Sequence, residues 1–357
     1  MDQVSTIGLD TAKRIFQVHG VDEAGAVVLR RQLRRSEVLK FFAKLPRCVV
    51  GMEACGGAHY WGREIAALGH EVRLMPPTRV KPPAFAGAGS TSNGRKSDKV
   101  DAAACCEAVT RPSMRFVPLK TVEQQAALMM HRARQLLVEQ RTRLGNAIRG
   151  HMSEIGIIAA KGGAGLGALV AFIGNPEDQH LPAVVRTILV PLVEQWRSAG
   201  AQIAELDRQI LAWHRNNADS QRLETIPQYG PILSSAMAAT IGDAARFDNG
   251  RACAAWIGLV PTQNSSGGRE RSGGISKTGD RYLRQLLVIA ATGMVRRARA
   301  HPEDHPWFAG LLERMPPKKA AVALANKLAR IGWAVLRHQT PYRARRLTAA
   351  APALEAA

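Results

Sequence analysis

The sequence predicts a mixed α/β domain at the N-terminus, a helical linker and a mainly α-helical C-terminal domain. Short β-type runs alternate with helical patterns up to about residue 80, and two long helical patterns with apolar repeats follow. After Arg222 the chain changes again, to short helical segments separated by Gly-rich stretches. The expected domains are residues 1–118, 119–220 and 221–345, with a flexible tail at 346–357.

The N-terminal domain is predicted from five apolar runs. Runs at 4–9, 15–21 and 26–29, the last two joined by a turn, indicate an antiparallel meander. Ser36 is expected to cap a helix, and the fully apolar run 48–52 is typical of a buried central strand. A helix at 58–68 and a strand at 71–75 complete the order. This order is that of the ribonuclease-H-like fold, although other α/β folds fit the same periodicity.

The next segments form a loop and a short helix. Residues 76–94 are rich in Pro, Gly and Ser, which indicates a loop, and Ser97 is expected to cap a helix that carries Asp98 and Asp101. Residues three apart share one helix face, so both carboxylates can point at one site.

The linker is predicted as a coiled-coil hairpin of two long helices. The first covers 121–155, and the second carries an apolar seam with alternating spacings of four and three from Leu192 to Trp213. The Gly-rich residues 156–180 between them are expected to form a turn. An ordinary helical bundle is the alternative.

The C-terminal domain begins with a turn and a helix of small residues. Residues 223–231 lead into the helix 234–241, which resembles a helix-hairpin-helix, although a plain turn between helices fits equally well. A polar, Gly-rich segment at 264–274 carries Ser266, and a last helix is expected at about 318–336.

Composition narrows the class of partner. The 357 residues carry a net charge of +20 with a pI of about 10.6, which favours a polyanion such as nucleic acid. No apolar run reaches 18 residues and no signal peptide is evident, so we expect a cytoplasmic protein without a membrane. Five cysteines without ligand spacing argue against zinc, and 5% aromatic residues do not indicate a base-stacking platform.

Four carboxylates are the first candidate site residues: Asp10, Glu53, Asp98 and Asp101. Asp10 and Glu53 each follow an apolar strand, where an acid without a partner is costly. Converging carboxylate oxygens select Mg²⁺, with Mn²⁺ as a possible substitute, and such ions can activate an oxygen that attacks phosphorus. The alternative is that each acid is a helix cap or a surface charge.

Ser266 is the candidate nucleophile, and two groups of basic residues are candidate nucleic-acid ligands. A serine in a Gly-rich loop is usually only a loop residue, but a metal could activate its hydroxyl. The first basic group surrounds the acids, and the second flanks Ser266: Lys13, Arg95, Lys96 and Lys99, then Arg269, Arg271, Lys277, Arg281 and Arg284. His59, Tyr60 and Trp61 follow Glu53 at the start of a helix and could line the site, but a packing role is preferred for them.

Several of these motifs together resemble the IS110 family of bacterial transposases. Residues 7–13, 52–61 and 96–102 are similar to the family's DEDD motifs, and the His-Tyr-Trp extension is similar to its 1111 subgroup. The segments 258–261, 265–268 and 275–284 resemble its C-terminal transposase domain. One departure is that the usual Ile-Pro-Gly-Ile-Gly turn reads Ile-Pro-Gln-Tyr-Gly at 226–230.

The resemblance implies a DNA transposase with a RuvC-like nuclease domain. Asp10, Glu53, Asp98 and Asp101 match the four acids that hold Mg²⁺, and Ser266 matches a serine that becomes a 5′-phosphoserine; Ser265 is the less favoured neighbour. A structured non-coding bridge RNA would pair with double-stranded donor and target DNA. The active site would be shared between protomers in a tetramer of two dimers.

Two other functions stay open at this point. A metal-dependent, structure-specific endonuclease of the Holliday-junction-resolvase type would need the four acids but not Ser266. A non-catalytic nucleic-acid-binding protein would need neither.

Overall fold

The computed structural model describes residues 3–80, 98–263 and 272–343. It divides into two compact units, residues 1–122 and 123–357, which are described separately below. None of the described helices is long and apolar enough to cross a membrane.

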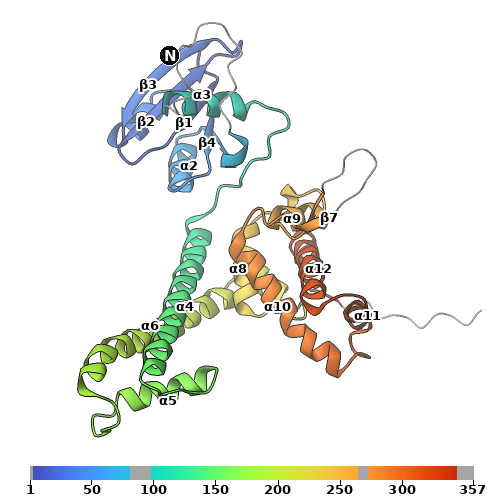
Figure 1. Ribbon diagram of the computed structural model, residues 1–357. Coiled ribbons are helices and arrows are strands. Elements are labelled where there is room, and N and C mark those ends of the chain that lie inside the picture. Colours follow the sequence, from blue (N-terminus) through green and yellow to red (C-terminus); the bar gives the residue numbers. More distant parts are fainter. Residues whose placement is uncertain (1–2, 81–97, 264–271, 344–357) are drawn as a thin grey trace, which may run out of the picture. The chain divides into compact units, whose positions relative to one another are not determined.

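The first unit is built on one five-stranded sheet in the order β3-β2-β1-β4-β5 (Figure 1). The strands β1 (Thr6–Asp10), β2 (Ile15–Val21) and β3 (Val27–Arg34) form the expected antiparallel meander. The strands β4 (Val49–Glu53) and β5 (Glu71–Met75) add parallel pairings beside β1. A mixed α/β domain is therefore confirmed. The strand β3 runs past its expected end because an edge strand tolerates polar side chains.

Helices cover both faces of this sheet. The helices α1 (Val38–Phe42) and α2 (Ala58–Ala67) share a core with Ile7 and Leu9, whereas α3 (Asp98–Val109) packs over Gly8, on the opposite face. This division follows from the alternation of side chains along β1. The expected Ser36 cap is wrong: a 3₁₀ turn at Arg35–Glu37 precedes α1, and the Glu37 carboxylate accepts a hydrogen bond from the Arg34 amide.

The second unit begins with three helices: α4 (Val122–Glu154), α5 (Gly163–Ile173) and α6 (Ala183–Arg215). The prediction of a plain turn between the long helices is wrong, because α5 lies there. Its apolar side chains Leu169, Val170 and Ile173 pack with Ile148 and Met152 of α4 in a small core. The glycines of α5 interrupt the helical pattern of apolar residues, so the sequence did not predict this helix.

The helices α4 and α6 run in opposite directions where they touch. Arg134 pairs with Asp207, and the Arg141 guanidinium lies 4.2 Å from the Trp196 ring centroid. Position numbers rise along α4 as they fall along α6, which is the antiparallel arrangement that the sequence predicted. The predicted seam has several partners, since the C-terminal part of α6 packs against α7 and α8.

The rest of the second unit is a helical domain with one two-stranded ribbon. Its apolar core, which includes Leu283, Leu287 and Leu328, lies mainly between α10 and α12. The elements are α7 (Ala218–Glu224), α8 (Pro231–Ile241), α9 (Gly250–Ile257), β6 (Pro261–Gln263), β7 (Ser272–Ile275), α10 (Arg281–Ala300), α11 (Pro306–Arg314) and α12 (Pro317–His338).

Candidate active site

Two of the four candidate acids end neighbouring parallel strands. Asp10 is the last residue of β1 and Glu53 the last residue of β4, and the two strands pair with Leu9 opposite Met52. Both acids are half-buried. Parallel strands end at the same edge of a sheet, where α/β proteins commonly place their ligands. We call this edge, with Asp10, Glu53 and Asp101, the acidic edge.

The helix α3 brings Asp101 to the same place. Cys105 lies one helical turn after Asp101, and its thiol is buried with 1% of its surface exposed. Burial is the largest cause that raises the pKa of the Cys105 thiol to about 12, and the negative charges of Asp10, Glu53 and Asp101 add to it. The helix α3 also packs against Gly8 of β1 and Gly51 of β4, the two strands that Asp10 and Glu53 end, so Asp101 is carried by a helix that lies on these strands.

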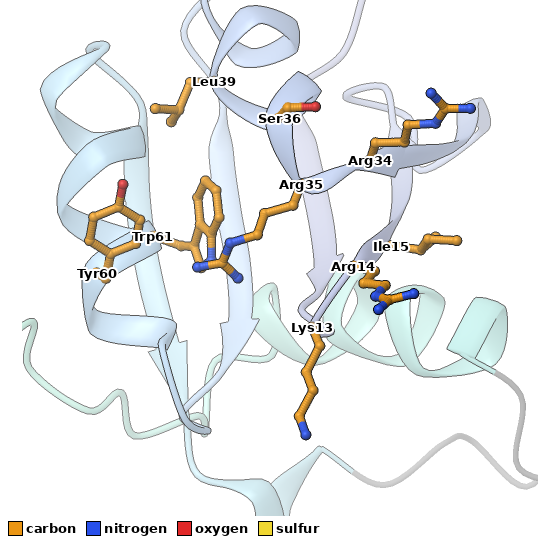
Figure 2. A pocket seen from close by; sticks show the side chains of 9 residues that line it. All are labelled: Lys13, Arg14, Ile15, Arg34, Arg35, Ser36, Leu39, Tyr60 and Trp61. Atoms are coloured by element: carbon orange, nitrogen blue, oxygen red, sulfur yellow. The ribbon is translucent and has the colours of Figure 1, made fainter.

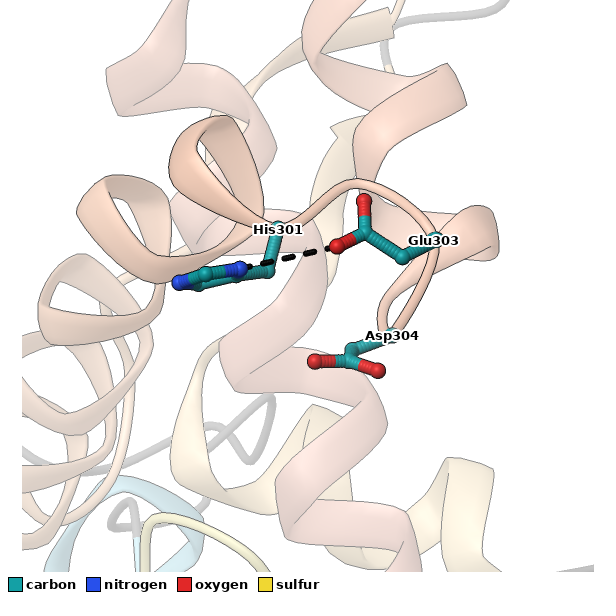
Figure 3. Close-up of side chains that lie close together, drawn as sticks. All are labelled: His301, Glu303 and Asp304. Carbon is teal, nitrogen blue, oxygen red and sulfur yellow. Dashed lines mark ion pairs between the residues drawn. The ribbon is translucent and has the colours of Figure 1, made fainter.

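The three acids do not form a closed ligand set. Within the described residues, the three side chains that come close enough to share a metal ion are His301, Glu303 and Asp304 (Figure 3). Their ligand atoms all lie within 4.8 Å of one another. That group is exposed, lies between α10 and α11, and was not anticipated from the sequence. The side chains of Asp98 and Lys99, together with Arg95 and Lys96, lie outside the described part of the chain.

Glu53 and Asp101 have no ion-pair partner among the described side chains, since no Lys, Arg or His pairs with either carboxylate. Half-buried carboxylates without a cationic partner favour an external cation, because their charge is only partly solvated.

The candidate nucleophile belongs to the second unit. Ser266 lies outside the described residues, as do Ser265, Arg269 and Arg271. The strands on either side of that segment pair antiparallel, with Pro261 opposite Ile275. The chain before and after the segment is therefore held together at its base.

Two of the family-like segments meet at this base. The amide of Lys277 donates to the Gly258 carbonyl, and the amide of Ser276 donates to the Val260 carbonyl. Gly258 has a φ of 83°, and a side chain there would meet the Thr278 carbonyl oxygen at 2.2 Å. Glycine is required by both the left-handed backbone and the close approach.

The described basic candidates differ in their surroundings. The Arg284 guanidinium donates to the carbonyl oxygens of Ile257 and Thr278, each at 2.7 Å, so it ties α9 to the segment before α10. Lys13, Lys277 and Arg281 are exposed. Their binding to nucleic acid stays a prediction.

The departure at 226–230 has a visible structural consequence. Gln228 adopts a left-handed backbone with a φ of 76°, at the position where the family's usual motif has glycine. The next residue, Tyr229, is buried and its hydroxyl donates to the Leu328 carbonyl at 3.0 Å. The hydrogen bond of Tyr229 to Leu328 thus holds the turn, although Gln228 has a left-handed backbone that glycine would adopt more easily.

Comparison with known proteins decides the family. A sequence model described as "Transposase IS116/IS110/IS902 family" matches residues 220–306, and a DEDD transposase model of the IS110 type matches residues 7–157. A probable family 20 transposase of Pseudomonas aeruginosa is 50% identical over 342 residues, covering 95% of this chain and 99% of that protein. The chain belongs to the IS116/IS110/IS902 family of transposases.

Two relatives from insertion elements support this placement. The transposase of IS1328 from Yersinia enterocolitica is 37% identical, covering 96% of this chain and 99% of that protein. The transposase of IS1111A from Coxiella burnetii is 36% identical, covering 96% of this chain and 92% of that protein. The resemblance inferred from the motifs is confirmed.

The matched ranges of this transposase contain all the candidate residues named first. The four acids fall within 7–157 and Ser266 falls within 220–306. Sequence reasoning missed Cys105, although its position four residues after Asp101 could have placed it on the same helix face.

Proposed function

We propose that this transposase cuts and rejoins DNA with Ser266 as the nucleophile and with a divalent metal ion at the acidic edge. The observation that carries the proposal is that Asp10 and Glu53 end neighbouring parallel strands, against which α3, the helix of Asp101, packs. The sheet order, an antiparallel meander followed by two parallel strands, supports an RNase H-like, RuvC-like assignment for the first unit.

The residues at the acidic edge fit a hard divalent cation. Asp10, Glu53 and Asp101, joined by Asp98, would supply carboxylate oxygens, the donors that Mg²⁺ and Mn²⁺ prefer. A bound ion would supply positive charge that lowers the pKa of the attacking hydroxyl and offsets the charge of the phosphate.

The cleavage step that we propose is a balanced transfer at phosphorus. The Ser266 Oγ forms a bond to phosphorus while the bond between phosphorus and the 3′ oxygen breaks. The serine proton ends on the 3′ oxygen, which leaves a 5′-phosphoserine and a free 3′-hydroxyl. In rejoining, another 3′-hydroxyl attacks the same phosphorus, and the serine hydroxyl is released.

The partners in this proposal are double-stranded donor and target DNA and a structured bridge RNA. The net charge of +20 supports a nucleic-acid partner, and the family resemblance supports the RNA. In the same proposal the acidic edge of one protomer works with the serine segment of another, in dimers that assemble into a tetramer. DNA flanking the gene should then encode a segment complementary to both the element end and the target.

The serine is tested with neighbouring variants. Purified protein, RNA transcribed from the flanking segment and labelled DNA carrying the element end are mixed, and the products are separated under denaturing conditions. We expect Ser266→Ala to abolish the covalent protein–DNA product and Ser265→Ala to retain it. An adduct that persists in Ser266→Ala would overturn the assignment of the nucleophile.

The acids are tested in the same assay. Asp10→Asn should abolish cleavage and the adduct while DNA binding is retained, because the carboxylate acts on the reaction and not on affinity. If Ser266→Ala still cleaves but Asp10→Asn does not, the protein is a structure-specific nuclease. Unchanged cleavage by Asp10→Asn would refute a role for the acidic edge.

A further inference from the structure

A basic pocket in the first unit has no role in the reaction described above (Figure 2). Its volume is about 730 Å³, within the range of small-ligand sites. Its charged and aromatic lining consists of Lys13, Arg14, Arg34, Arg35, Tyr60 and Trp61.

The pocket is at the same end of the sheet as the candidate acids. Lys13 and Arg14 lie in the short connection between β1, which ends at Asp10, and β2. The strand β2 begins there with Ile15, which pairs with Arg34 at the end of β3. A ligand in the pocket would therefore lie next to the edge where Asp10 and Glu53 end their strands.

The pocket carries positive charge that the protein does not neutralise. No acidic residue lines it, and none of its four cations forms an ion pair within the described residues. Glu37 is close in sequence, but its carboxylate accepts from the Arg34 amide. Guanidinium groups bind phosphate oxygens with paired hydrogen bonds, so this charge suits a phosphodiester.

The aromatic wall of the pocket combines a fixed ring with an exposed one. Trp61 is only 5% exposed and packs edge-on against Phe16, with ring centroids 5.0 Å apart. The Arg35 guanidinium covers the indole at 4.9 Å from its centroid, as Figure 2 shows. Tyr60 stays 43% exposed, edge-on to Trp61. An exposed ring beside cations is the arrangement on which a base can stack.

We propose that this pocket binds one unpaired nucleotide of a nucleic-acid strand, with phosphates on Lys13, Arg14 and Arg34 and the base on Tyr60. This inference rests on the proposed function, because a nucleotide bound in the pocket would position its strand at the acidic edge. The low aromatic content argued against an extended stacking platform, and a single exposed ring is consistent with a single nucleotide. The strand can be DNA or RNA, and the experiment distinguishes them.

The phosphate contacts are tested with two matched double variants. Arg14→Ala with Arg34→Ala removes two charges from the pocket, and Lys44→Ala with Arg47→Ala removes two exposed charges near the start of β4, at the opposite end of the sheet. Full-length proteins are titrated with labelled single-stranded DNA and, separately, RNA across a range of salt concentrations. The slope of log affinity against log salt should become shallower by about 1.4 in the pocket variant and remain unchanged in the control. An equal change in both variants, or none in either, would overturn the proposal.

The stacking contact is tested at Tyr60. Tyr60→Ala should weaken binding roughly fivefold or more, whereas Tyr60→Phe should keep the affinity because it keeps the ring. Loss in the DNA arm assigns the pocket to the substrate strand, and loss in the RNA arm assigns it to the guide. Unchanged binding by Tyr60→Ala, with cleavage still dependent on Asp10, would reject this inference and leave the proposed function standing. If Tyr60→Ala weakens binding but cleavage does not depend on Asp10, the pocket inference stands and the proposed function is rejected.

Discussion

At the scale of single residues, His131 shows how burial sets a protonation state. It is 1% exposed on α4, and its ring nitrogens lie 3.0 Å from the Tyr282 hydroxyl and 3.0 Å from the Ser235 hydroxyl. The Ser235 hydroxyl donates to the Pro231 carbonyl, so Nε2 donates to Ser235 and Nδ1 accepts from Tyr282. Burial, followed by the charge of Arg134, lowers the pKa of His131 to about 4.

This histidine should make stability depend on pH. Between its ordinary pKa of 6.5 and about 4, the unfolded chain binds a proton that the folded protein does not. The contribution of His131 to the free energy of unfolding should therefore be highest above the ordinary pKa and fall with decreasing pH, by about 2 kcal/mol between about pH 7.5 and about pH 5. Urea unfolding at the two pH values, followed by circular dichroism, measures this change.

The control for this prediction lies on the same helix. His131→Gln keeps a donor and an acceptor but does not titrate, so its stability should fall less on acidification. His151→Gln changes an exposed histidine of α4 and should retain the pH dependence of the wild type. Identical pH dependence in all three proteins would exclude His131 as the cause.

At the scale of elements, the contact between α3 and the sheet sets the position of Asp101. A side chain at Gly8 would lie 2.1 Å from the Ala102 carbonyl oxygen and 2.3 Å from the Cys106 nitrogen. At Gly51 it would lie 2.6 Å from the Cβ of Val109. The helix can approach this closely only because both strands have glycine at the contact.

Gly8→Ala should therefore push α3 away from β1. We expect a loss of stability of about 1–3 kcal/mol, since the obstacle is helix backbone that cannot rotate aside, and a fall in DNA cleavage as Asp101 moves. Thermal unfolding and the cleavage assay measure the two effects. Gly56→Ala, which meets no atom within 4 Å, should leave both unchanged. Equal stability and equal cleavage in the two variants would show that Gly8 does not set the position of α3.

The elements also show which parts of the fold the sequence patterns predicted and which they did not. Strand periodicity located β1, β2, β4 and β5 because each is a short apolar run with clear turns. It missed α5, whose glycines dilute the helical pattern, although tertiary contacts with α4 stabilise that helix. The seam of α6 was visible, but the elements that cover each part of it were not.

At the scale of the whole molecule, the net positive charge is the property that most affects binding to DNA. The chain has 49 Lys and Arg against 29 Asp and Glu, and binding a duplex would release the counterions held by its phosphates. If the protein contacts six to ten phosphates, its affinity for duplex DNA should fall about 10³- to 10⁵-fold between about 50 and 200 mM salt. Fluorescence anisotropy with a labelled duplex measures this dependence, and an affinity that is constant across that range would contradict it.

The sequence alone determined the family, the mixed α/β class of the first unit and the identity of the candidate acids. Those properties reside in local motifs and in short apolar runs. Only the tertiary structure showed that α3, the helix of Asp101, packs against β1 and β4, the strands that Asp10 and Glu53 end. It also grouped Lys13, Arg34 and Tyr60 in one pocket. The physical reason is that these residues are separated along the chain, and their proximity depends on how the helices pack against the sheet.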